Sequence, residues 1–329
     1  MDEPQKISEI GEFGLIDRLA QKLPQIHHDD LILGIGDDTA VIRKDDGHVI
    51  LITCDIQVEN QHFRLKNISP YQLGKRAMAV NLSDIAAMGG TPTFALVSMG
   101  VPGNFPLAHF DDLNRGMADM LAEFGAQVIG GNLSSTERDL IIDITLLGEA
   151  PAGKFLTRGG ARPGDRIYVT GTPGMSGAGF AIIERYGTGY PPELAEFVKA
   201  HLEPVPRITA GIKLARSGIV TAMIDISDGI ASDLNHICVQ SNVGALLNQT
   251  QFPQPGAAER IETVAGKQFH KLALHSGEDY ELLFTVKEDS DISMLDSIAR
   301  ETNTNFTKIG IIQPMDEGFW MIKTLGENI

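Results

Sequence analysis

The stretch 31–55, LILGIGDDTAVIRKDDGHVILITCD, constrains the fold most, because adjacent acids follow directly on an apolar run. A Gly-Ile-Gly turn leads into Asp37 and Asp38, and two strand-like runs follow, ending at Asp55. Two carboxylates about 4 Å apart repel each other by roughly 4 kcal/mol at an effective dielectric near 20. A chain that brings acids together at strand ends therefore needs cations or solvent there. The stretch indicates either a surface turn or one wall of a Mg²⁺ site.

Length and charge narrow the class of protein. The chain has 329 residues, enough for two domains, and its 43% hydrophobic and 21% charged residues are ordinary for a soluble globular protein. A net charge of −16 argues against nucleic acid and against an anionic membrane as partners, because both attract basic surfaces. The same charge suits a protein that collects divalent cations.

The cysteines and the N-terminal residues bear on the cellular compartment. Cys54 and Cys238 lie far apart, which excludes a disulfide framework and a thiolate zinc site and fits a reducing compartment. The first residues, MDEPQKISEIGEF, are acidic and contain no apolar signal-peptide core. No stretch approaches the ~18 apolar residues of a membrane span. We therefore expect a soluble, cytoplasmic protein.

Apolar periodicity and helix breakers predict a mixed α/β layer domain in the first 150 residues, because the strands and helices do not follow a regular βαβ series. The expected helices are Ile7–Leu23, Pro70–Met88 with Ser69 as N-cap, and Pro106–Phe124. The expected strands are Thr39–Ile42, His48–Thr53, Thr93–Val101, a short buried strand at Ala126–Ile129, and Leu140–Leu147.

The segment 158–164, RGGARPG, is the best candidate for a domain boundary, and a second α/β set follows it. Its expected strands are Arg166–Thr170, Val220–Ile226, Val243–Leu247, Tyr280–Val286, Phe306–Ile312 and Phe319–Ile322. Its expected helices lie near Ala178–Arg185, Pro192–His201, Pro206–Ser217, Gly229–Gln240 and Ile292–Thr302.

Neither glycine-rich turn matches a known phosphate-binding loop. The segment 171–179, GTPGMSGAG, has no Lys after its glycines, which a P-loop requires. The turn at 34–36 is followed by acids where a dinucleotide-binding turn would open a helix. A tight strand-to-helix turn is the favoured interpretation of 171–179.

Oxygen-bearing side chains recur at the ends of the predicted elements. Such positions suit Mg²⁺, which binds a few carboxylates together with substrate phosphates. Each acid taken singly also reads as an N-cap or a turn residue, so both interpretations stay open. The residues are Asp38, Asp55, Asp84 with Asn81 on the same helical face, and Asp225 and Asp228 on either side of Ser227. His62, Glu278 and Asp279 are weaker candidates, since a packed or surface histidine and a turn that caps a strand explain them equally well.

An ordered set of motifs goes beyond these patterns. They are GEFGLI (11–16), GIGDDTAV (34–41), TCDIQVENQHF (53–63), AVNLSDIAAMGG (79–90), IGGN (129–132), TRGGARPGD (157–165), IDISDG (224–229) and SGEDYEL (276–282). In these motifs the chain resembles the thiamine-monophosphate kinase family, in the superfamily of aminoimidazole ribonucleotide synthetase. The resemblance runs in order over nearly the whole chain.

This resemblance implies a fold and a reaction. The fold is two α/β domains, residues 1–150 and 151–329, in which the N-terminal sheets of two subunits pair in a homodimer. The reaction is the ATP-dependent phosphorylation of thiamine monophosphate to thiamine diphosphate, with ATP as co-substrate and several Mg²⁺ ions as cofactors. The acceptor is a phosphate oxygen that is already largely ionised at neutral pH, since its second pKa is near 6, so we expect no general base. Direct transfer would then depend on positioning and on charge neutralisation by Mg²⁺ and Arg158.

The resemblance also implies roles residue by residue. The Mg²⁺ ligands are Asp38, Thr53, Cys54 through its backbone, Asp55, Asp84, Asn132, Asp225 and Asp228. The ATP contacts are Phe124, Gly131, Asn132, Arg158 on the triphosphate, and Ser227. The thiamine-phosphate contacts are His62 and Glu278.

Three departures from the family pattern accompany the resemblance. Asn132 stands where many members have Asp, Gly174-Met175-Ser176 stands where they have Gly-Asp-Ser, and the sequence reaches Ile329 without their aromatic-glycine-aromatic-x-His-Phe tail. We therefore expect the cover over the thiamine rings to differ. Two alternatives stay open: a non-catalytic, Mg²⁺-dependent binder of nucleotide or thiamine phosphate, and a sister ATP-dependent synthetase of the same superfamily.

Overall fold

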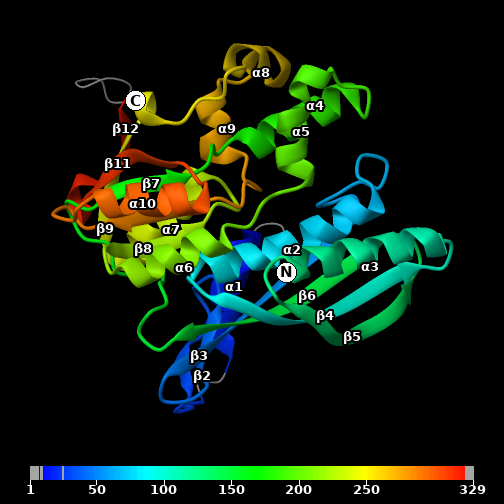
Figure 1. Cartoon of the computed structure of the whole chain (residues 1–329), viewed down its shortest axis with the longest axis horizontal. Helices are drawn as coiled ribbons and strands as arrows, with labels where there is room; N and C mark the ends of the chain where they lie inside the picture. Colours follow the sequence, from blue (N-terminus) through cyan, green and yellow to red (C-terminus); the bar gives the residue numbers. More distant parts are fainter. Residues whose placement is uncertain (1–6, 8–9, 24–25, 323–329) are drawn as a thin grey trace, which may run out of the picture.

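The computed structural model describes residues 7, 10–23 and 26–322, which form two mixed sheets of six strands (Figure 1). The first has the order β1-β2-β3-β6-β4-β5, with β4 and β5 parallel and the other neighbours antiparallel. The second has the order β12-β9-β11-β7-β10-β8, with β12 and β9 parallel and the other neighbours antiparallel. The expectation of a mixed α/β architecture is confirmed. Among the described residues, no helix is long and apolar enough to cross a membrane.

The elements of the first half agree with the predicted pattern, apart from β1, which the sequence patterns did not predict, and two corrections. The strands are β1 (Leu31–Leu33), β2 (Ala40–Arg43), β3 (His48–Val58), β4 (Thr91–Pro102), β5 (Gln127–Thr136) and β6 (Ile141–Pro151), and the helices are α1 (Gly11–Lys22), α2 (Pro70–Ala87) and α3 (Leu107–Ala122). The expectation of a short buried strand at Ala126–Ile129 is wrong, because β5 is longer and lies exposed at the sheet edge. The second strand does not end at Asp55 but continues to Val58.

The second half adds two helices that the sequence patterns did not predict, α8 (Ala258–Ala265) and α9 (Phe269–His275). Its other helices are α4 (Met175–Tyr186), α5 (Ala195–Leu202), α6 (Ile208–Ser217), α7 (Ile230–Ser241) and α10 (Ser293–Thr302), with short 3₁₀ turns at Pro192–Leu194, Gln249–Gln251 and Met315–Glu317. Its strands are β7 (Arg166–Thr170), β8 (Val220–Asp225), β9 (Val243–Asn248), β10 (Leu282–Val286), β11 (Phe306–Pro314) and β12 (Phe319–Ile322).

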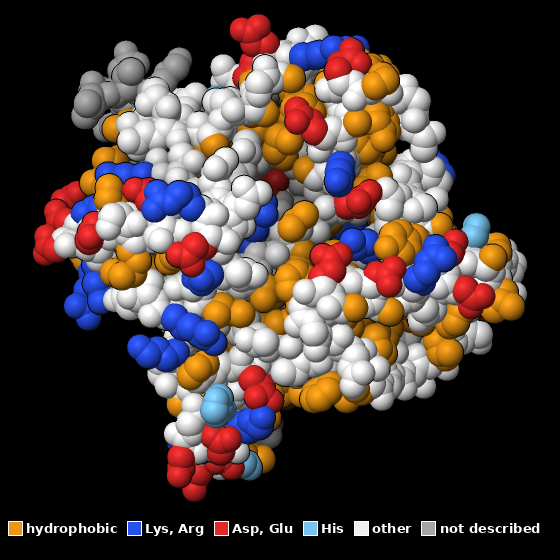
Figure 2. Space-filling view, in the orientation of Figure 1, with side chains coloured by type: hydrophobic (Ala, Val, Ile, Leu, Met, Phe, Trp, Pro, Cys, Tyr) orange, Lys and Arg blue, Asp and Glu red, His pale blue; other side chains and the backbone are white. Residues whose placement is uncertain are grey.

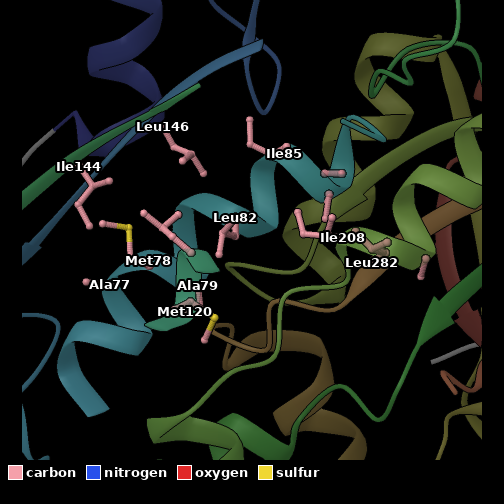
Figure 3. Close-up of a cluster of buried hydrophobic side chains, with 14 of the residues drawn as sticks. Ala77, Met78, Ala79, Leu82, Ile85, Met120, Ile144, Leu146, Ile208 and Leu282 are labelled. Atoms are coloured by element: carbon pink, nitrogen blue, oxygen red, sulfur yellow. The ribbon is translucent and has the colours of Figure 1, made fainter. Parts of the chain in front are cut away.

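Helix α2 is the central element of the molecule. Its start is fixed by a capping box in which the Ser69 hydroxyl accepts from Gln72 N and the Gln72 side chain accepts from Ser69 N. Figure 3 shows Ile144 and Leu146 of β6 on one side of α2 and Ile208 of α6 with Leu282 of β10 on the other. The helix is therefore buried between the two sheets, and side chains on its different faces meet both halves of the chain.

Acidic and basic side chains are mixed on the face shown in Figure 2, without a continuous basic surface there. Acidic side chains gather on the projecting tip of the β2–β3 hairpin, where Asp45 and Asp46 form the turn (Figure 2).

Two glycines let α3 lie against α2 at backbone distance. A Cβ added to Gly74 would stand 2.1 Å from the carbonyl oxygen of Leu113, and one added to Gly116 would stand 2.1 Å from that of Tyr71. Both contacts are with backbone, which cannot rotate away as a side chain can. The pair therefore sets the position of α2, which carries several candidate site residues.

We predict that Gly116→Ala lowers the melting temperature by about 5 °C, since overpacking costs about 1–3 kcal/mol. The same exchange inside an unobstructed helix would raise stability, because Ala is a better helix former. Gly256→Ala is the control, because a Cβ there meets nothing within 4 Å. Thermal unfolding followed by circular dichroism measures both, and a Gly116→Ala protein as stable as wild type would contradict the close approach.

Candidate functional site

Three carboxylates from distant parts of the sequence meet in one cluster. Asp38 lies just before β2, Asp84 in the last turn of α2, and Asp225 at the end of β8. Each offers an oxygen that lies within 4.8 Å of an oxygen of the other two. The fold thus brings together three of the acids that the sequence suggested as ligands.

Hydroxyl groups and one guanidinium hold these acids in place. The Ser83 Oγ donates to Asp225 Oδ2 at 2.6 Å, and the Thr53 Oγ1 of β3 donates to Asp84 Oδ2. The Arg158 Nη2 donates to Asp38 Oδ1 at 2.6 Å. Neighbouring residues of α2 thereby contact both β8 and β3, so the position of the cluster depends on this helix.

Burial makes the ionised form of the cluster costly. It raises the pKa of Asp38 to about 8, against the opposing effect of Arg158, and that of Asp225 to about 6. The pKa of Asp84 is raised well above its ordinary value, first by burial and then by the charges of Asp55 and Asp225. Because these folded-state values exceed the ordinary 3.8, the acids favour the fold below about pH 4, and that contribution is lost as the pH rises toward 8.

The donor set fits Mg²⁺. Carboxylate oxygens are the ligands that this hard cation prefers, and Asp38 Oδ2 is buried with no hydrogen-bond partner among the described residues. A buried oxygen without a partner costs free energy unless something binds it. A divalent cation among the three carboxylates would satisfy this oxygen and oppose their repulsion.

Strand β3 carries three of the candidate ligands on two faces. Thr53 and Asp55 point to the face covered by α2, and the Asp55 charge raises the pKa of both Asp84 and Asp225, so Asp55 adjoins the cluster. Cys54 points to the opposite face, where its Sγ lies 3.3 Å from Asp143 Oδ1. Its side chain is therefore turned away from the acids, and its backbone is the part left for a ligand role.

Asp37 and Asp38 have different surroundings. The Asp37 carboxylate accepts from Asp38 N at 3.0 Å and from Arg158 N at 3.1 Å. Its oxygens thus fix the backbone of the loop and the start of the 158–164 segment. Asp38, whose Oδ2 is not used in this way, is the better candidate ligand.

The turn after β8 presents Ser227 and Asp228 to solvent. Asp233, in the first turn of α7, accepts from the backbone N of Asp228 and of Gly229 through Oδ2, at 3.2 and 3.0 Å. This buried carboxylate, whose pKa burial raises to about 8, holds the turn. The charge of Asp228 also raises the pKa of Asp225, which places Asp228 at the edge of the cluster.

A pocket opens beside the other end of α2 and includes His62, Arg76 and His201 in its lining. The Arg76 Nη2 donates to Glu278 Oε1, and His201 Nδ1 lies 3.7 Å from Glu278 Oε2. The two residues that the sequence suggested for the thiamine-phosphate side thus lie around one pocket.

Strand β5 lies apart from the acids. In the sheet, Asn132 pairs with Ser98, Ser98 with Asp143, and Asp143 with Ile56 of β3. Three strand spacings separate Asn132 from β3, or about 14 Å. Gly131 precedes Asn132 on the same edge strand, and Phe124, partly buried, lies between α3 and β5. Within one chain, the structure does not bring these residues together with the carboxylate cluster.

Met175, one of the departures, has a local explanation. It lies at the first position of α4, whose N-terminal N–H groups are taken by Asp279, which accepts from Gly174 N at 2.7 Å and Ser176 N at 3.0 Å. Met175 lines a second pocket together with Asp279 and Glu281. An aspartate at this position would face Asp279 and Glu281. Met175 therefore avoids a repulsion between acids, and it does not replace a ligand of the carboxylate cluster.

Comparison with known proteins agrees with this arrangement. The family description "AIR synthase related protein, N-terminal domain" matches residues 36–150, and "AIR synthase related protein, C-terminal domain" matches residues 162–322. The thiamine-monophosphate kinase of Escherichia coli strain K12 is 38% identical over 314 residues, 95% of this chain and 94% of that protein. The chain belongs to the thiamine-monophosphate kinase family.

Two further members of the family show the same extent of similarity. The thiamine-monophosphate kinase of Bacillus subtilis strain 168 is 33% identical over 317 residues, 96% of this chain and 95% of that protein. The solved structure of AaThiL complexed with AMPPCP and TMP has a TM-score of 0.85 and 30% identity, with 99% of each chain covered. Family membership confirms the fold and the kinase class that the motifs predicted.

Sequence reasoning missed several polar residues of the site. Ser83 lies inside the motif at 79–90, next to Asp84, and Asp233 lies four residues after the motif at 224–229, so their spacing from Asp84 and Asp228 was a usable signal. Arg76 lies two helical turns before Asp84 and shares its side of α2, which was a weaker signal. His201 gave none, because its partners come from α2, α4 and the loop before β10.

We predict that Asp84→Asn folds and, in EDTA, melts at or slightly above the wild-type temperature, because one of several crowded carboxylates is neutralised. At 100 times its Kd, Mg²⁺ should add about 2.7 kcal/mol to the free energy of unfolding of the wild-type protein and so raise its melting temperature. The melting temperature of the variant should stay nearly unchanged. Asp46→Asn, at the exposed tip of the β2–β3 hairpin, makes the same charge change and should keep the full Mg²⁺ response. An undiminished Mg²⁺ response in Asp84→Asn would exclude Asp84 as a ligand.

Proposed function

We propose that this protein transfers the γ-phosphoryl group of ATP to thiamine monophosphate and so forms thiamine diphosphate. The observation that carries the proposal is the position of α2, which places the carboxylate cluster at one end and the pocket of His62 and Arg76 at the other. The proposed metal–nucleotide side and the proposed acceptor side would thus lie about 12 Å apart along one rigid helix. The names of the relatives and the relative solved with AMPPCP and TMP support this assignment.

The chemistry asks little of side-chain acids and bases. The attacking group is a phosphate oxygen that is already ionised near neutral pH, so no general base is needed. Arg158, which donates to Asp38, would donate to the triphosphate and stabilise charge during direct in-line transfer. When bound, Mg²⁺ ions would supply further charge neutralisation. Their proposed ligands are Asp38, Asp55, Asp84, Asp225, Asp228, Thr53, the backbone of Cys54, and Asn132.

The remaining roles follow from the same proposal. Ser227 and Gly131 would contact ATP, with Phe124 stacked near the base, and His62 and Glu278 would receive thiamine monophosphate. The division into residues 1–150 and 151–329 and a cytoplasmic location also stay predictions. Glu278 remains one-third exposed, which leaves its carboxylate accessible to an acceptor.

We predict that the purified protein, given Mg²⁺, ATP and thiamine monophosphate, releases ADP and thiamine diphosphate in equal amounts. Asp84→Asn should lower this rate by more than about 100-fold, because even the residues that orient metal ligands are worth 10–100-fold. Without thiamine monophosphate, label should not pass from ADP to ATP, since direct transfer forms no phosphoenzyme. Mg²⁺-dependent nucleotide binding without turnover would identify a non-catalytic binder instead. Turnover only with another phosphorylated heterocycle would identify a sister enzyme.

We also propose a homodimer in which the first sheets of two copies face each other. The face of this sheet opposite α2 exposes apolar side chains, among them Ile56 at 49%, Phe94 at 41% and Leu96 at 40%. Apolar side chains gathered on one face of a sheet are typical of an interface. Because Asn132 lies about 14 Å from β3 in its own chain, we propose that Asn132 of the partner subunit completes the ligand set.

A heterodimer tests this arrangement. Asp84→Asn and Asn132→Ala homodimers should each have little activity. A heterodimer of the two, purified with two different tags, should have about half the wild-type activity, since one of its two symmetry-related sites is intact. If Asn132 acted within its own chain, both sites of the heterodimer would be defective. A heterodimer as inactive as its parents, or a monomeric wild-type protein, would therefore contradict the proposal.

A further inference from the structure

Arg76 is a cation in the interior of the protein. Its side chain is 1% exposed, and it lies on α2 among apolar residues such as Leu73 and Ala77. A buried ion pair contributes little to stability compared with well-packed apolar residues of similar size. Packing alone therefore does not account for a guanidinium at this position.

The donors of Arg76 are aimed at a few acceptors around the pocket that includes His62, Arg76 and His201. Nη1 donates to the carbonyl oxygen of His201 at 2.8 Å and lies 3.3 Å from His201 Nε2, while Nη2 donates to Glu278 Oε1. The Nε is buried without a hydrogen-bond partner among the described residues. Arg76 thus holds both the α5 backbone and the carboxylate of Glu278.

His201 extends this contact as a neutral group. Burial, followed by the nearby charge of Arg76, lowers the His201 pKa to about 3. With Nε2 facing an Arg76 donor, the proton lies on Nδ1, which is 3.1 Å from Ser176 Oγ and 3.7 Å from Glu278 Oε2. Ser176 is in turn tied through its backbone N to Asp279.

The backbone at Glu278 is held in an uncommon conformation. Its φ is +56°, in the left-handed region, and Tyr280 follows with φ +51°. Glu278 N donates to Ser227 O at 2.7 Å, and Tyr280 N donates to Ile226 O at 2.9 Å. Such conformations persist where the surroundings determine them strongly, and they gather at functional sites. The backbone contacts and Arg76 together fix where the Glu278 carboxylate points.

We propose that Arg76 is a positioning residue that, through Glu278, His201 and Ser176, sets the geometry in which the protein receives the organic part of its acceptor. The inference rests on the proposed function and assigns a role to residues that do not themselves transfer the phosphoryl group. A carboxylate accepts hydrogen bonds and attracts positive charge, so the held Glu278 selects an acceptor whose ring system offers an N–H donor or a cation.

A matched pair of variants separates positioning from stability. Arg207 donates twice to Glu281, at 2.7 and 2.5 Å, and forms a similar Arg–Glu pair on the same loop, but it lines the second pocket. Arg76→Lys should raise KM for thiamine monophosphate about 10-fold, as expected for a lost charged hydrogen bond, and should change KM for ATP less than about 2-fold. Both variants should lower the melting temperature, because each weakens a partly buried Arg–Glu pair. Arg207→Lys, however, should leave KM for thiamine monophosphate within about 2-fold of wild type.

A second variant and a binding measurement keep the test decisive. Ser176→Ala removes only the hydroxyl beside His201 and should raise KM for thiamine monophosphate about 3-fold, so it decides the question if Arg76→Lys does not fold. Calorimetry with thiamine monophosphate alone should show the same order of affinities without turnover. An unchanged KM in a folded Arg76→Lys protein, or an equal rise in Arg207→Lys, would overturn the positioning role.

The wild-type protein distinguishes this failure from that of the proposed function. If the wild-type protein turns over thiamine monophosphate and the variants have the same KM for it, only the positioning role is contradicted. Wild-type binding of thiamine monophosphate without turnover contradicts the proposed kinase reaction, and the calorimetric affinities then test the positioning role. A wild-type protein that neither binds nor phosphorylates thiamine monophosphate contradicts both.

Discussion

The repulsion among Asp38, Asp84 and Asp225 is the constraint on which the site depends. Carboxylate oxygens within 4.8 Å of one another in a buried setting are costly, as the raised pKa values of all three acids show. The fold tolerates this cost because hydroxyls, Arg158 and a closely packed central helix hold each acid in place. A protein that only needed to be stable would have no reason to keep such a cluster, whereas one that binds Mg²⁺ and phosphates requires it.

Helix α2 links this cluster to the rest of the molecule. Asp84 and Ser83 lie near its C-terminal end and Arg76 lies two turns earlier, so one rigid rod carries contacts to the acids and to the pocket of Glu278. The loops that follow β8 and precede β10 are joined by backbone hydrogen bonds, including Glu278 N to Ser227 O. The carboxylate cluster and the pocket that includes His62 and Arg76 are therefore fixed relative to each other by both α2 and these loops.

Much of the fold follows from local signals. The capping residues Ser69 and Pro70 and the glycines at 89–90 marked α2 within one or two residues of its observed ends. The two unpredicted helices, α8 and α9, have only eight and seven residues, and so short a helix shows little apolar periodicity in the sequence. The burial of β5 was misjudged, because an apolar strand sequence does not reveal whether a second strand lies beyond it.

The sequence by itself determined which chemical groups were present and which secondary elements carried them. Motif order identified the family, and Asp38, Asp84 and Asp225 could be named as candidate ligands because their residue types suit Mg²⁺. Only the tertiary structure decided which of these groups meet. Strand β6 inserts between β3 and β4, which leaves β5 at the sheet edge and Asn132 far from the acids of its own chain. Arg76 meets Glu278 across 202 positions in the chain, through packing that no local pattern encodes. Local propensities act over a few residues, whereas strand order and helix packing are settled by the burial of the whole apolar surface.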